Sequence, residues 1–199
     1  MKITFSALLC ALSAVAFGAP VSGSSSDSLV KRDATVLYST SADYILRVYE
    51  GSPKLPAQIG YGAEISRTGG KYEIDNYVSF YLPDHRGLPA AVTDASKCRI
   101  VIKDPLYSTE SQRTQVFTVP AERAFSTVST FDWDSKPSGD KHVATLYVPE
   151  TGVSVAEEFG VFDCKFAAYN QFVFRPVGDD DHIAWYQSGV QGAFLEVLE

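Results

Sequence analysis

The chain has 199 residues, of which 45% are hydrophobic and 13% aromatic, and its formal net charge is -7. This content of apolar residues supports a real core and argues against disorder over most of the length. The acidic balance argues against nucleic-acid phosphates and anionic lipid surfaces as partners, because both need a positive field. Length and composition therefore predict one folded domain.

The first 18 residues have the order of a secretory signal peptide. Lys2 precedes an apolar run over residues 3–12, and small residues follow up to Gly18. A membrane anchor would need about 20 predominantly apolar residues, whereas this stretch is shorter and is interrupted by serines. We expect cleavage after Gly18 and a secreted product, extracellular or in the cell wall, with no membrane contact after processing.

Residues 19–32 have the composition of a pro-segment. They are rich in serine, contain no aromatic residue and end in Lys31-Arg32, directly before Asp33. Such a segment buries too little to fold, and flexible segments are where proteolysis concentrates. The dibasic pair is similar to a processing site for a kexin-type protease of the fungal secretory route, although it could also be a solvated charge pair in a linker. Cleavage there would leave residues 33–199 as the mature domain.

Two cysteines remain once the signal segment is removed with Cys10. In an oxidising compartment Cys98 and Cys164 should form a disulfide. The alternatives are two buried free thiols or a metal site. A metal site is disfavoured because two cysteines and three scattered histidines show no ligand spacing. We predict the disulfide, no metal and no cofactor.

Residues 33–199 read as short apolar or alternating runs separated by Gly, Pro, Asp and Ser, without a long segment at helical period. Alternation, clear in 77–82 and 143–148, indicates strands with one packed and one solvated face. We predict an all-β fold, a two-sheet antiparallel sandwich of jelly-roll or immunoglobulin-like type. Residues 155–159 would form a helical turn at most. The expected strands are 35–38, 44–49, 72–82, 99–102, 115–119, 143–148, 171–177, 182–187 and 193–198.

Several short motifs resemble a fungal family. An alternating strand ends in Leu82-Pro83 and is followed by a Lys-Cys-Arg-Ile-Val-Ile-Lys-Asp-Pro run at 97–105. Phe162-Asp163-Cys164, the aromatic strand 183–187 and a closing Gly-Ala-Phe-Leu at 192–195 follow. Together they are similar to the But-type C-terminal domain, named for a ubiquitin-like-modifier activating enzyme binding protein, in its secreted branch. The resemblance covers residues 60–199 and implies a β-sandwich with a Cys98–Cys164 bond and no catalytic residues.

Catalytic motifs are absent from the sequence. A nucleophile needs a base held by a third group, and there is no Gly-x-Ser-x-Gly elbow. His85, His142 and His182 each lie in or beside a predicted turn, which is typical of exposed loop residues. We therefore expect a non-enzymatic protein.

Two acidic segments each allow a functional interpretation beside a structural one. Asp132 and Asp134 flank Trp133, and paired carboxylates could cleave a glycoside if they faced each other across the bond. Ordinary loop composition explains them as well. Asp179-Asp180-Asp181 with His182 could bind a hard cation such as Ca²⁺, but a solvated hairpin turn is favoured because EF-hand spacing is missing.

Aromatic residues offer a candidate ligand face, since their rings combine a flat apolar surface with a polar group. Within Trp185-Tyr186, one ring must point inward in a regular strand. Two hypotheses result. The first is a secreted non-enzymatic interaction or effector-like protein that contacts cell-wall polysaccharide or an extracellular protein. The second is a secreted protein that binds or cleaves carbohydrate through its aromatics and Asp132 or Asp134. The candidate ligand-face residues are Trp133, Trp185 and Tyr186, with Tyr61, Tyr107 and Tyr147 as further aromatics.

Overall fold

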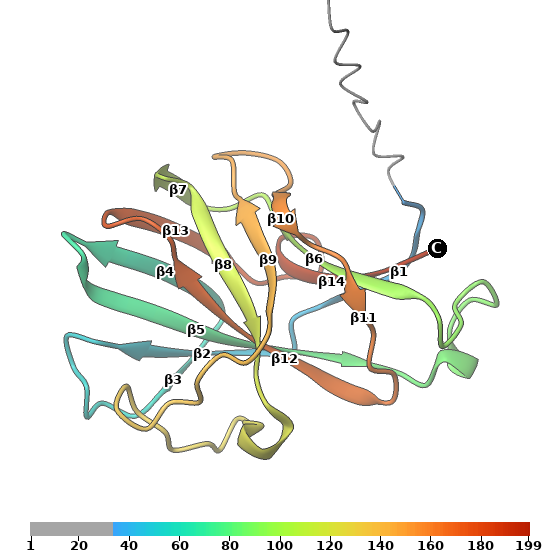
Figure 1. Cartoon of the computed structure of the whole chain (residues 1–199), viewed down its shortest axis with the longest axis horizontal. Helices are drawn as coiled ribbons and strands as arrows, with labels where there is room; N and C mark the ends of the chain where they lie inside the picture. The colour runs from blue at the N-terminus through green and yellow to red at the C-terminus, as the bar shows by residue number, and fades with distance from the viewer. Residues whose placement is uncertain (1–33) are drawn as a thin grey trace, which may run out of the picture. The chain divides into compact units, whose positions relative to one another are not determined.

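Antiparallel strands account for most of residues 34–199, the part of the chain that the computed structural model describes (Figure 1). The predicted signal peptide, the pro-segment with Lys31-Arg32 and the proposed first mature residue Asp33 lie outside the described residues. In the described part, no helix has the length and hydropathy of a membrane span.

The smaller sheet has four strands in the order β1-β14-β6-β11. Its central pair, β14 and β6, is in register over seven residues of each strand, and β1 covers the outer edge of β14. The bounds are β1 (Val36–Ser41), β14 (Gly192–Leu198), β6 (Lys97–Lys103) and β11 (Phe162–Asp163).

The larger sheet has ten strands, and its main path is β10-β9-β8-β12-β5-β4-β13-β7. Strand β2 pairs with β5, and β3 pairs with β2. The bounds are β2 (Tyr44–Tyr49), β3 (Gln58–Gly60), β4 (Gly62–Thr68), β5 (Lys71–Leu82), β7 (Tyr107–Glu110), β8 (Arg113–Thr118), β9 (His142–Tyr147), β10 (Val155–Phe159), β12 (Ala168–Pro176) and β13 (Asp181–Tyr186).

The two sheets enclose the main core, which confirms the predicted sandwich. Alternate residues of β5, such as Phe80, pack against residues of the smaller sheet, such as Ile100 and Leu195. Period-two alternation puts these side chains on the inner faces. The Cys98–Cys164 disulfide is also confirmed, with Cα atoms 5.2 Å apart. It joins β6 to the segment between β11 and β12.

The opposite face of the larger sheet carries a second, smaller core. Residues 119–141, which connect β8 to β9 and include the 3-10 helix η2 (Ala121–Arg123), pack over Tyr77 of β5 and Leu46 of β2. Phe125, Phe131 and Trp133 are the aromatic residues that this connection contributes. The connection passes close to β3 in Figure 1, where the Ala57 N–H donates to the Phe131 carbonyl.

All nine predicted strands are present, with shifted ends at most of them, but five strands were missed: β3, β4, β7, β10 and β11. The prediction of at most a helical turn at 155–159 is wrong, because these residues form β10 at the edge of β9. Most of its side chains are exposed, so no alternation of apolar residues marks it. Arg113 of β8 forms a bidentate ion pair with Glu157 of β10, 2.7 Å at its closest.

Candidate functional site

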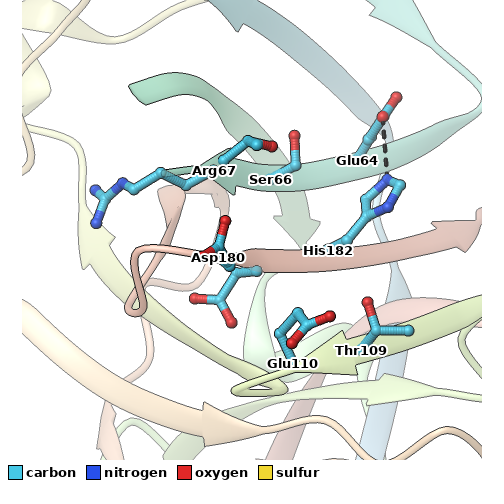
Figure 2. Close-up of a pocket in the computed structure, with 9 residues that line it drawn as sticks. Glu64, Ser66, Arg67, Thr109, Glu110, Asp180 and His182 are labelled. Carbon is cyan, nitrogen blue, oxygen red and sulfur yellow. Dashed lines mark hydrogen bonds and ion pairs between the residues drawn. The ribbon is translucent and has the colours of Figure 1, made fainter. Parts of the chain in front are cut away.

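A polar hollow of about 560 Å³ lies on the outer face of the sheet formed by β4, β13 and β7. In the strand register, His182 of β13 lies directly opposite Ser66 of β4 and Thr109 of β7. Figure 2 shows these side chains together over the sheet. The hollow is lined by Glu64, Ser66, Arg67, Thr68, Thr109, Glu110, Asp180, Asp181 and His182.

The His182 imidazole is held between two neighbours. Its Nε2 lies 3.3 Å from Oε1 of Glu64, the contact drawn as a dashed line in Figure 2. The Tyr107 ring meets the imidazole edge to face, with ring centroids 4.4 Å apart. Partial burial and the Glu64 carboxylate raise the pKa of the Tyr107 phenol, so the phenol remains a neutral hydrogen-bonding group. The three side chains form a fixed polar and aromatic wall.

A buried amide positions Glu64. Strand β5 pairs with β4 through its first residues and with β2 further along, so β4 diverges from β5 at this point. The Asn76 side chain, fully buried, fills the resulting fork. Its Nδ2 donates to the Glu64 carbonyl at 2.6 Å, and the Glu64 N–H donates to its Oδ1 at 3.2 Å. The side-chain amide thus replaces the missing ladder bonds of β4.

The aspartates beside the hollow hold turns. Asp181 Oδ2 accepts from the N–H groups of Val177 and Gly178, and Asp180 Oδ1 accepts from the Gly69 N–H at 2.8 Å. These contacts match the hairpin-turn interpretation of Asp179–Asp181. Between residues 34 and 199, no group of three or more His, Cys, Asp or Glu side chains is arranged to hold a metal ion.

Exposed aromatic side chains adjoin the hollow. Tyr186 follows Ala184 by two residues on β13 and is therefore on the same outer face, and Tyr107 lies directly opposite Ala184. Tyr61 precedes β4 and accepts from the Gln187 N–H through its carbonyl. The exposed fractions are 84% for Tyr61, 51% for Tyr186 and 38% for Tyr107. The structure thus brings Tyr107 and Tyr186 together on one face, while Tyr61 is exposed just before β4.

The two tryptophans do not belong to this face, which corrects the predicted ligand set. Trp185 is 1% exposed and packs in the main core, where it contacts Phe174. It has the inward-pointing position of the Trp185-Tyr186 pair. Trp133 is half-buried in the second core, and Lys136 Nζ lies 2.9 Å from the centroid of its ring. Its ring face is therefore occupied by a cation.

Asp132 and Asp134 make local contacts in the β8–β9 connection. Asp132 Oδ1 accepts from the Ser135 N–H at 2.9 Å and from its hydroxyl at 2.7 Å, while Asp134 pairs with Lys54 at 2.8 Å. The bonds from Ser135 lower the pKa of Asp132. A general acid in glycoside cleavage needs the opposite shift. These contacts support the interpretation of the segment as a structural loop.

The three histidines are half-buried rather than exposed. His85 lies in the 3-10 helix η1 (His85–Gly87) and contacts Asp94 at 2.9 Å. His142 begins β9 and stacks on Phe117. Only His182 faces the hollow. Tyr147 is also half-buried, and its hydroxyl donates to Gln112 at 2.7 Å.

Sequence reasoning missed the β4 side of the hollow. Ala63 and Ile65 alternate with Glu64 and Ser66, and this short pattern of a half-buried strand could have identified β4. The role of Glu64 could not be found in this way, because its partner His182 is 118 positions away.

No family model matches the chain, and no curated protein matches it. The functional assignment therefore depends on the residues themselves.

Proposed function

We propose that the chain is a secreted, non-enzymatic β-sandwich protein that binds neutral cell-wall polysaccharide on the outer face of β4, β13 and β7. The observation that carries the proposal is the position of Tyr107 and Tyr186 on the face that holds an open hollow lined with hydrogen-bonding side chains. Tyrosine rings offer flat apolar surface for the C–H face of a sugar, and their hydroxyls remain available for hydrogen bonds.

The polar groups of the hollow suit a polymer of hydroxyls. Glu64 and Glu110 can accept hydrogen bonds from sugar hydroxyls, and the imidazole of His182 can donate or accept them. Among the described residues, Arg67 is the only lysine or arginine in the lining, and its Nε donates to the Glu73 carboxylate at 3.0 Å. An excess of carboxylates disfavours anionic polymers and leaves neutral polysaccharide as the ligand class.

Secretion is supported by the signal-like residues 1–18 and by the disulfide, which suits an oxidising compartment. The acidic charge and the resemblance to the secreted branch of the fungal But-type domain agree with this proposal. Binding is proposed in place of cleavage because Asp132 and Asp134, the sequence candidates for glycoside chemistry, are held by turn and ion-pair contacts.

Retention of the purified protein on insoluble chitin, β-glucan and cellulose tests the proposal. We expect retention on at least one of these polymers. Losing about 1 kcal/mol of ring contact weakens binding roughly fivefold, so Tyr107→Ala and Tyr186→Ala should each reduce retention by about that factor. Tyr169→Ala is the matched control, because Tyr169 is 55% exposed on β12, away from the hollow.

Three results would contradict the proposal. Absence of retention on all three polymers would exclude the ligand class and favour an extracellular protein partner. Release of soluble sugar by the wild-type protein would exclude the non-enzymatic part. Equal loss in Tyr169→Ala and Tyr186→Ala would show that retention does not depend on this face.

A further inference from the structure

A lysine and an aspartate meet inside the second core. Lys136 Nζ lies 2.7 Å from Oδ2 of Asp75, and the exposed fractions of the two side chains are 16% and 0%. Asp75 lies on β5, whereas Lys136 belongs to the β8–β9 connection, 61 positions away. The carboxyl carbon of Asp75 is one bond from the oxygen that the amine contacts. The pair therefore already has the proximity that an addition reaction needs.

Burial shifts the protonation equilibria of both groups toward their neutral forms. Burial raises the pKa of Asp75 to about 6, and burial lowers the pKa of Lys136. The Trp133 ring covers the amine. Arg175 Nε donates to Oδ2 of Asp75 at 3.2 Å, so a guanidinium faces the oxygen that would carry negative charge during addition.

Within residues 34–199, Asp75 Oδ1 is buried and has no hydrogen-bond partner. A buried polar atom without a partner is costly, and such atoms call for an explanation. The Glu73 carboxyl lies two residues away on the same face of β5 and is paired with Arg67 at 3.0 Å, so it is the neighbouring acid for proton transfer in the proposal below. One carboxyl can thus supply and remove protons at the other.

We propose that Lys136 and Asp75 condense to an intramolecular amide bond. The neutral Nζ adds to Cγ of protonated Asp75, forming the N–C bond, and the carbonyl electron pair moves to the oxygen beside Arg175. Glu73 takes a proton from nitrogen and delivers it to the departing hydroxyl. The C–O bond breaks, and one water leaves. An amine and a carboxylic acid give an amide and water, with no oxidant or reductant.

The bond would lock the β8–β9 connection onto the larger sheet. The aromatic side chains of this connection cover the second core, and the amide would hold them there covalently. This proposal is independent of the proposed polysaccharide binding, because none of its residues lines the hollow.

Mass spectrometry of the full chain tests the proposal. The purified protein is incubated for several days at neutral pH, reduced, denatured and digested. We expect a branched peptide in which the segment containing Asp75 is joined to the segment containing Lys136, about 18 Da lighter than their sum, the mass of one water. Only linear peptides from folded, disulfide-bonded protein would overturn the proposal.

Two variants assign the groups. Lys136→Arg keeps a cation between Asp75 and Trp133 but removes the amine, so we expect linear peptides and a lower Tm. Glu73→Gln keeps both reacting groups, and we expect branched peptide to be strongly reduced. A branched peptide in Lys136→Arg would show that another lysine reacts, which would refute the assignment. Full branching in Glu73→Gln would refute the role of Glu73 in proton transfer.

Discussion

The substitution Asn76→Asp tests whether the buried amide at the β4–β5 fork holds the wall of the hollow. The change is nearly isosteric, so its effect must come from hydrogen bonding and charge. Asn76 donates to the Glu64 carbonyl at 2.6 Å and accepts from the Glu64 N–H at 3.2 Å. A carboxylate can still accept from the N–H, but it presents a second acceptor to the carbonyl.

The magnitude follows from these two contacts. Losing one hydrogen bond costs about 1 kcal/mol, and leaving the Glu64 carbonyl unpaired against the buried side chain of residue 76 costs a further 1–3 kcal/mol or so. We expect Asn76→Asp to lower the free energy of unfolding by about 2–4 kcal/mol at pH 7. Burial raises the pKa of the new carboxyl above its unfolded value, so the folded state binds the proton more tightly.

The pH dependence gives the sharper result. Below the unfolded pKa, about 4, the protonated acid can donate to the Glu64 carbonyl and restore the bond. As pH rises through the raised folded pKa, this stabilisation is lost, so the deficit relative to wild type should be larger at pH 7 than at pH 4. Urea unfolding of both proteins at both pH values measures it, and Asn76→Ala is the control without a titrating group. An equal deficit at both pH values would refute the reasoning.

Three further predictions concern stability. Replacing Cys98 and Cys164 together by Ala opens a loop of 66 residues and should lower the free energy of unfolding by about 4 kcal/mol in urea titrations. Reduction of the wild-type disulfide should have the same effect. A loss near zero in both experiments would contradict the prediction. Trp133→Ala removes a half-buried anchor of the second core, so we expect a lower Tm with unchanged polysaccharide retention, whereas lost retention at normal Tm would place Trp133 in the binding face. In Gly62→Ala the new Cβ would lie 2.3 Å from the Trp185 carbonyl oxygen, which should force β4 away from β13. We expect this variant to have a lower Tm and weaker retention on polysaccharide. Wild-type thermal stability would show that β4 can shift at no cost.

Most strands could be predicted from the pattern of residues within short segments of the sequence. The alternation in 77–82 and 143–148 placed parts of β5 and β9, because a strand with one buried face repeats its apolar residues every second position. This alternation did not identify the edge strands. Strand β10 has mostly exposed side chains, so its backbone pairing with β9 left no apolar pattern in the sequence.

The candidate site was predicted only in part. Tyr186 and Tyr107 were identified as aromatics, but their place beside His182 depends on β13 pairing with β7 and β4. The Lys136 amine lies over the ring of Trp133, and this contact follows from the path of the β8–β9 connection. Residue type alone does not distinguish a ring that binds a ligand from one that anchors a loop.

Composition, alternation and cysteine number by themselves determined the all-β sandwich and its disulfide. These are properties of short segments and of residue counts, and they hold whichever strands become neighbours. The tertiary structure alone decided that Glu64 meets His182 across 118 positions and that Lys136 meets Asp75 inside a second core. Such contacts arise from strand order and loop path, which the packing of the whole chain sets.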